Sequence, residues 1–184
     1  MKAIVQLYWQ ICLMRVSPDQ VPAAATLMGL TFLAYSATFF IARLGFDELS
    51  LTFTAISYIV ITLFWATMIY AVLMFKGVAG RFQQTFTAVL GTDVLLSLFL
   101  VPLSEIGSGF PPQSPGATLF GVLVLLVLIW DVLVKGFIFR HAFNVTPLLG
   151  NLFSLMLSFL IMMLAQALLM EFEPQALEAM KGNG

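Results

Sequence analysis

The apolar stretch ATLFGVLVLLVLIWDVLVKGFIFR, residues 117–140, decides how the rest of the chain can fold. It is long enough to cross a bilayer as a helix, since about 20 apolar residues suffice. Asp131 and Lys135 nevertheless lie within it, one helical turn apart on one face. Charged side chains inside a bilayer cost free energy unless they face protein or water. We therefore expect the other spans to shelter this pair.

The composition of the whole chain indicates its class. Of the 184 residues, 61% are hydrophobic and only 9% are charged, whereas soluble domains are about one quarter charged. The sequence therefore predicts an all-α, polytopic transmembrane helical bundle that forms a single domain over residues 1–184. The net charge of −1 argues against nucleic acid as a partner, because nucleic-acid binding requires a basic surface. The single cysteine, Cys12, excludes an internal disulfide and a thiolate metal cage.

Five transmembrane spans are expected. The apolar runs cover residues 23–44, 51–75, 84–103, 117–140 and 146–170, and an acidic tail follows at 171–184. Gly91, Thr92 and Asp93 interrupt the third run, where Asp93 could cap a broken helix or bond to Thr92 and a neighbouring hydroxyl. Three prolines between Ser104 and Gly116 predict an exposed, irregular loop before the fourth span.

Residues 1–16 predict a shorter, amphipathic helix. One Lys and two Gln recur at every fourth position and form a polar stripe. The segment is too short to span the bilayer, and Tyr8 and Trp9 suit the headgroup zone. We therefore expect an interfacial helix that lies in the plane of the membrane. The alternative is a helix that packs on the protein's own spans.

The distribution of Lys and Arg predicts the orientation of the spans. Five crossings place the termini on opposite sides of the membrane. One side collects Lys2, Arg15, Lys76, Arg81, Lys135 and Arg140, whereas the other collects only Arg43 and Lys181. The sequence therefore predicts a cytoplasmic N-terminus and an extracytoplasmic C-terminus.

The residues best suited to chemistry form an intramembrane polar cluster of Asp93, Asp131, Lys135 and Thr92. At a rise of about 1.5 Å per residue, Asp93 and Asp131 lie roughly 13–15 Å from the same membrane face. Two carboxyls and one ammonium group could share a proton, as in a proton relay or a cation site. Alternatively, Asp131 and Lys135 neutralise each other, and the polar residues hold the helices together.

Four residues at the predicted membrane edge are candidates for contact with lipid headgroups: Lys76, Arg81, Arg140 and His141. The lone histidine has no neighbouring Cys or carboxylate and does not indicate a metal site. The sequence carries no P-loop, no dinucleotide-binding fingerprint, no GxSxG and no HExxH motif. We therefore expect no catalytic residue, no cofactor and no metal, and the protein is predicted not to be an enzyme.

The junction of the second and third spans reads FKGVAGRFQQTFTAVLGTDVLLSLFLVPL, residues 75–103. Its glycine-bearing loop, Gly91 within the span and Pro102 at the close of the span resemble the YIP family of Ypt/Rab-interacting membrane proteins and their bacterial relatives. The next junction adds Trp130, Gly136, Arg140, His141 and Asn144 to the resemblance, which covers about residues 20–170. It implies a five-span domain with a cytoplasmic N-terminus in a bacterial inner membrane. Eukaryotic members of the family act in vesicle trafficking and membrane shaping through small GTPases.

Two functional hypotheses follow. The first is a non-enzymatic integral membrane protein that binds membrane lipids, other membrane proteins or a second copy of itself, in a scaffold, membrane-organising or assembly role. The second is a small transporter, channel or proton-coupled accessory subunit that uses Asp93, Asp131 and Lys135.

Overall fold

The computed structural model describes residues 2–43 and 50–173, and throughout these ranges the regular structure is helical, with no strand. The elements are α1 (Lys2–Cys12), η1 (Pro18–Gln20), α2 (Ala25–Arg43), α3 (Leu51–Phe75), η2 (Ala79–Arg81), α4 (Phe82–Ser108), α5 (Pro115–Phe143) and α6 (Pro147–Phe172). In the described part of the chain, helices α2 to α6 are long and apolar enough to cross a membrane. The prediction of a five-span, all-α membrane bundle is therefore confirmed.

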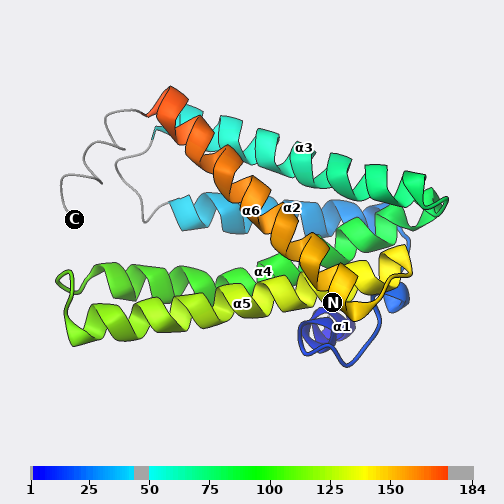
Figure 1. The fold of residues 1–184 in the computed structure, drawn as a ribbon, viewed down its shortest axis with the longest axis horizontal. Coiled ribbons are helices and arrows are strands. Elements are labelled where there is room, and N and C mark those ends of the chain that lie inside the picture. The colour runs from blue at the N-terminus through cyan, green and yellow to red at the C-terminus, as the bar shows by residue number, and fades with distance from the viewer. Residues whose placement is uncertain (1, 44–49, 174–184) are drawn as a thin grey trace.

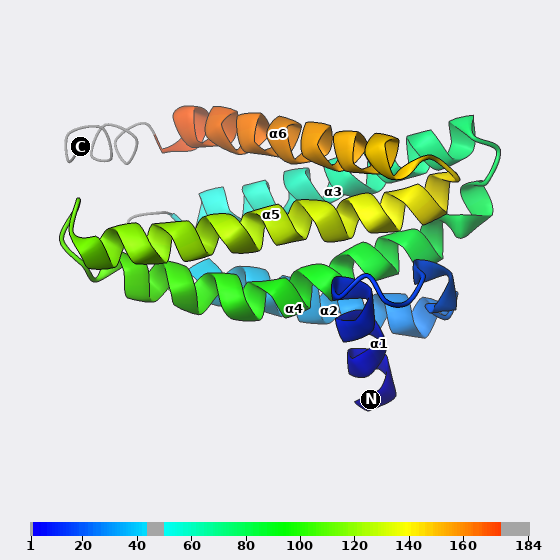
Figure 2. The ribbon, with the colours of Figure 1, turned by 60° about the horizontal axis from the view of Figure 1, so that its bottom comes forward.

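The five long helices run along one common direction, and α1 stands across them (Figures 1 and 2). Helices α4 and α5 form a hairpin that packs along its length, α6 lies against α5, and α2 lies against α4. Helix α3 contacts α6 and α4 and has only a small contact with α2. At its free end the α4–α5 hairpin extends beyond the ends of α2, α3 and α6 (Figure 1).

Hydroxyl side chains begin three of the long helices. Ser50, Ser114 and Thr146 have extended backbone, and the side-chain oxygen of each accepts a hydrogen bond from a backbone N–H in the first helical turn. These bonds satisfy amides that would otherwise lack partners at a helix start. Asn144 ends α5 in the left-handed conformation, with φ 51°, so that α6 turns back along α5 within a few residues.

The structure corrects two expectations, an interruption of the third span and the extent of the loop that follows it. Helix α4 continues without a break through Gly91, Thr92 and Asp93, and it contains Pro102 in its interior. The irregular loop is also shorter than expected, because α4 runs to Ser108 and α5 begins at Pro115. In apolar surroundings there is no water to bond a freed backbone group, so helical hydrogen bonding persists past residues that break helices in soluble proteins.

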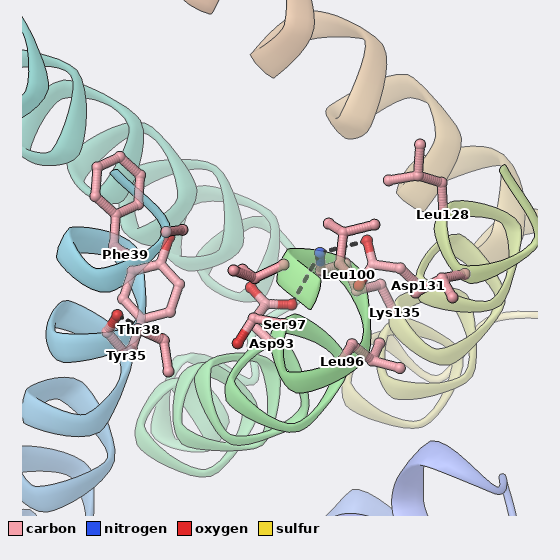
Figure 3. A pocket seen from close by; sticks show the side chains of 13 residues that line it. Tyr35, Thr38, Phe39, Asp93, Leu96, Ser97, Leu100, Leu128, Asp131 and Lys135 are labelled. Carbon is pink, nitrogen blue, oxygen red and sulfur yellow. Dashed lines mark hydrogen bonds and ion pairs between the residues drawn. The ribbon is translucent and has the colours of Figure 1, made fainter. Parts of the chain in front are cut away.

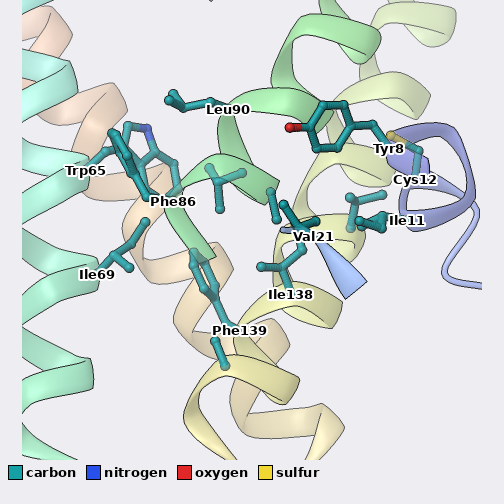
Figure 4. Packing of buried hydrophobic residues seen from close by; sticks show 14 of the residues in the cluster. Tyr8, Ile11, Cys12, Val21, Trp65, Ile69, Phe86, Leu90, Ile138 and Phe139 are labelled. Carbon is teal, nitrogen blue, oxygen red and sulfur yellow. The ribbon is translucent and has the colours of Figure 1, made fainter. Parts of the chain in front are cut away.

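An aromatic cluster, Trp65, Phe139, Phe143 and Phe153, joins α3, α5 and α6. Figure 4 shows Trp65 and Phe139 of this cluster. The rings of Phe139 and Phe143 are stacked with their centroids 5.3 Å apart, and the ring of Phe153 meets each of them edge-on at 5.1 Å. The cluster belongs to a larger buried core that includes residues of α1 and α4. It fills the bundle on the side of the α5–α6 turn.

Helix α1 packs on the spans, as the alternative interpretation of residues 1–16 predicted. The hydroxyl of Tyr8 lies 3.0 Å from Thr31 Oγ1 on α2, and Trp130 Nε1 donates a hydrogen bond of 2.8 Å to the carbonyl of Cys12. The ring of Tyr8 covers Gly91, where an added Cβ would lie 2.5–2.7 Å from ring atoms. Gly91 therefore lets α1 approach the backbone of α4.

Candidate functional site

Lys135 joins two carboxylates that come from two different helices. Its ammonium nitrogen lies 2.7 Å from Asp131 Oδ2, one turn earlier on α5, and 2.9 Å from Asp93 Oδ1 on α4. The three side chains are 9%, 20% and 15% exposed for Lys135, Asp131 and Asp93. The close pairing of α4 with α5 brings them together, as the estimate of equal depth predicted (Figure 3). We call Asp93, Asp131 and Lys135 the charge cluster.

The charge cluster borders a cavity of about 230 Å³ between α2, α4 and α5. The other lining residues are Tyr35, Thr38, Phe39, Ala42, Leu96, Ser97, Leu100, Val101, Val127 and Leu128. Tyr35, Thr38 and Ser97 add hydroxyl groups to a wall that is otherwise apolar (Figure 3). The cavity therefore combines hydrophobic walls with charge at one place, as ligand pockets in proteins commonly do.

The ion pairs leave one carboxylate in excess. With all three groups ionised, two negative charges face one positive charge, and the cluster carries a net charge of −1. An uncompensated charge at this depth is costly, because the surroundings solvate it poorly. A proton or a bound cation would neutralise it.

Toward the α5–α6 turn, the charge cluster borders packed apolar side chains. The ammonium group of Lys135 lies 5.1 Å from the centroid of the Trp65 ring, a cation–π contact. The Trp65 ring lies 6.1 Å from the Phe139 ring, and Ile138 and Phe139 on the next turn of α5 are fully buried. The residues that line the cavity reach no further toward the α5–α6 turn than Asp93 on α4 and Lys135 on α5. The cavity is therefore a pocket that ends at the charge cluster.

Thr92 does not join the other three residues of the predicted polar cluster. It is fully buried, and its hydroxyl donates to the carbonyls of Ala88 and Val89 within α4, at 3.0 and 2.9 Å. It does not line the cavity. Its side chain therefore satisfies its hydrogen bond locally and contributes to packing.

Sequence reasoning missed the hydroxyl residues that line the cavity. Ser97 follows Asp93 by one helical turn, so helical spacing could have indicated it. Tyr35 and Thr38 share a face of α2 by the same spacing, but their place opposite Asp93 depends on which spans pack together. A single sequence carries no direct signal for that pairing.

The predicted headgroup contacts fall into two groups. Arg81 bonds to the protein, since its Nη1 donates to the carbonyl of His141 and to Asn144 Oδ1, each at 3.2 Å. Nδ1 of His141 lies 2.9 Å from the carbonyl of Phe137, and the two rings meet edge-on. Lys76 and Arg140 are exposed, and their side chains make no hydrogen bond or ion pair with the described residues. Arg81 is thus a structural link between the α3–α4 and α5–α6 turns.

Within residues 2–43 and 50–173, no three His, Cys, Asp or Glu side chains gather closely enough to hold a metal ion. The charge cluster is occupied by its own ammonium group. What distinguishes this multi-pass membrane protein is a pocket with a charged end inside a bundle of apolar helices. Comparisons of the chain with protein-family models, with curated proteins and with solved structures find no match.

Proposed function

We propose that this chain is a non-enzymatic, multi-pass membrane protein that acts by binding a lipid, another membrane protein or a second copy of itself, in a scaffold or membrane-organising role. The observation that carries the proposal is a cavity with mostly apolar walls whose lining stops at the charge cluster. The lining of this cavity does not extend past Asp93 and Lys135 toward the α5–α6 turn, and a pocket of this kind holds a ligand more readily than it conducts one.

The lining of the cavity indicates the kind of group that fits it. Its walls are mostly aliphatic and aromatic, and the charge cluster at its end carries one excess negative charge when all three groups are ionised. A polar or cationic group attached to an apolar segment satisfies both surfaces. Such groups occur on lipids and on the spans of other membrane proteins.

The membrane and the orientation of the chain are part of the proposal. Arg15, Lys76, Arg81 and Arg140 lie near the end of the bundle where α3 turns into α4 and α5 turns into α6. The positive-inside rule favours a cytoplasmic location for this end. With the resemblance to the YIP family, this distribution supports a bacterial inner-membrane protein with a cytoplasmic N-terminus.

Cross-linking in intact membranes tests the binding role. A photo-cross-linking residue in place of Leu100, which lines the cavity, is expected to give a discrete adduct that is lost in the Asp93→Asn variant. The same residue in place of Leu98, which is 60% exposed on the outer face of α4, serves as the matched control. A monomeric protein with identical adduct patterns at both positions contradicts the proposal.

The excess charge of the cluster favours a second candidate, a proton-coupled or cation-coupled transporter, channel or accessory subunit. Flux of protons and of monovalent cations into proteoliposomes is compared for the wild type, Asp93→Asn and Asp131→Asn. Loss of flux in both variants, with the fold retained, supports this candidate. Equal flux in all three proteins, with a change in stability alone, excludes it.

A further inference from the structure

A second cavity, of about 130 Å³, lies on the outer side of the contact between α5 and α6. Its lining residues are Met14, Leu133, Gly136, Phe137, Arg140, Pro147 and Asn151. None of them is acidic, and Arg140 supplies the only formal charge among them. The cavity shares no lining residue with the cavity beside the charge cluster.

Two glycines bring the polar groups of this second cavity together. A Cβ added to Gly150 would lie 2.5 Å from the carbonyl oxygen of Gly136 and 3.0 Å from the backbone nitrogen of Arg140. A Cβ added to Gly136 would collide with the side chain of Asn151. The backbones of α5 and α6 are therefore in direct contact here, which places Arg140 and Asn151 on one cavity.

Arg140 is a cation without a protein partner. It is exposed, and its side chain makes no hydrogen bond, ion pair or ring contact with the described residues. Its guanidinium group carries five N–H donors in a planar fork that matches the oxygens of a phosphate. The amide of Asn151 adds a neutral donor at the same cavity. The two side chains therefore present donors to an oxyanion.

An apolar stripe on α5 leads to Arg140. Leu119, Val122, Leu126, Ile129 and Leu133 are 57%, 49%, 55%, 48% and 39% exposed. They follow one another at intervals of three or four residues and so share one face of the helix. Arg140 lies two turns beyond Leu133 on this face. The stripe has the length and character of a surface for an acyl chain, and the cation stands at its end.

We propose that Arg140 and Asn151 bind the phosphate of an anionic phospholipid whose acyl chain lies along this stripe of α5. The inference rests on the proposed function as a membrane protein that acts by binding, and it assigns a lipid to one specific place. That place is separate from the charge cluster, so each proposal can fail while the other stands.

Lipid titration of the full-length protein in detergent tests the site. The dissociation constant for phosphatidylglycerol is measured by native mass spectrometry for the wild type, Arg140→Gln, Arg140→Lys, Asn151→Ala and Lys76→Gln. A charge-assisted hydrogen bond corresponds to about tenfold or more in affinity. We expect Arg140→Gln to weaken binding at least tenfold, Arg140→Lys and Asn151→Ala to weaken it less, and Lys76→Gln to change it by less than twofold. Asp93→Asn is expected to leave binding unchanged, which separates this test from that of the charge cluster.

Three results would overturn the assignment. Equal losses in Arg140→Gln and Lys76→Gln would show diffuse attraction to charge and no site. Competition by glycerol 3-phosphate at the concentration of the lipid would show a site for a free anion. Unchanged lipid binding in Arg140→Gln, together with loss of a protein cross-link, would assign the cavity to an acidic partner. Because Arg140 is exposed and unpaired, its replacement is expected to leave the helical content and the size-exclusion profile unchanged.

Discussion

The ammonium group of Lys135 lies 2.9 Å from the carboxylate of Asp93, although the two residues stand on different spans. A contact of this kind ties α5 to α4 at the depth where solvation by water is weakest. Asp131 completes the arrangement at 2.7 Å, and Trp65 of α3 covers the ammonium group. The charge cluster is thus a meeting point of three helices.

Removing the single cation is expected to be the most damaging change to the charge cluster. Lys135→Met leaves two carboxylates together without a counter-charge, and we expect it to cost about 3–5 kcal/mol of unfolding free energy. Asp93→Asn is expected to cost less, because Lys135 keeps its bond to Asp131. Thermal unfolding in detergent measures both variants. The double variant Asp93→Asn with Lys135→Met is expected to recover part of the loss, and equal stability of Lys135→Met and wild type would refute this account.

The contact between Gly91 and Tyr8 is expected to tolerate no side chain. Gly91→Ala places a methyl group 2.5–2.7 Å from the Tyr8 ring, which forces α1 outward at a cost of about 1–3 kcal/mol. Cleavage within residues 1–16 by a protease measures the detachment of α1. Gly29→Ala in α2 is the control, since nothing lies within 4 Å of its added Cβ. Equal cleavage of the two variants would contradict the packing of α1 on α4.

Cys12 is expected to resist alkylation and to make the protein less stable to unfolding as the pH becomes alkaline. Burial, and then the nearby carboxylates of Asp93 and Asp131, raise the pKa of its thiol from 9.0 to about 12. The folded protein therefore holds this proton more tightly than the unfolded chain does. The resulting stabilisation is present below pH 9 and is lost as the pH rises from 9 toward 12.

Two measurements check the behaviour of Cys12. A water-soluble maleimide is expected to label the unfolded protein at pH 8 and to leave the folded protein unlabelled, because the reactive thiolate is scarce. The difference in unfolding free energy between wild type and Cys12→Ala is expected to shrink from pH 8.5 to pH 10.5. A difference that stays constant over this interval would show that the thiol is not buried as described.

Arg81 is expected to hold two turns of the chain together. Arg81→Met leaves the carbonyl of His141 and the amide oxygen of Asn144 without their charged donor, and such bonds are worth about 1.5–3 kcal/mol each when buried. These atoms lie near the surface, so we expect the lower end of that range. Faster hydrogen exchange in residues 76–81 and 141–146 is the readout. Lys76→Met is the control, because it removes a charge from the same turn and the Lys76 side chain bonds to no described residue. We expect it to change the rate of hydrogen exchange little.

The length and apolar composition of the runs were sufficient to predict the five spans. The Asp131–Lys135 pair also followed from helical spacing, and the estimate of depth correctly brought Asp93 to it. The sequence also suggested a break at Gly91 and an end of the third span near Pro102, whereas α4 continues through both, because a freed backbone group finds no other partner in apolar surroundings.

What could not be predicted depends on how the spans pack. The cavity wall contributed by Tyr35 and Thr38 requires α2 to lie against α4, and one sequence does not encode that choice in any local pattern. The role of Arg81 was missed for the same reason. In the sequence, a basic residue at a membrane edge indicates a headgroup contact. Only the structure shows that the carbonyl of His141, on the neighbouring turn, accepts a hydrogen bond from Arg81.

The extension of the α4–α5 hairpin has a practical consequence. With 29 residues, α5 measures about 43 Å, whereas the hydrocarbon layer is about 30 Å thick. The tip around Gln113 is therefore expected to stand in water on the side opposite the Arg81 turn. A single thiol introduced there as Gln113→Cys, in a Cys12→Ser background, gives an impermeant dye a target on one face of a sealed vesicle and so reports which compartment each end of the molecule occupies.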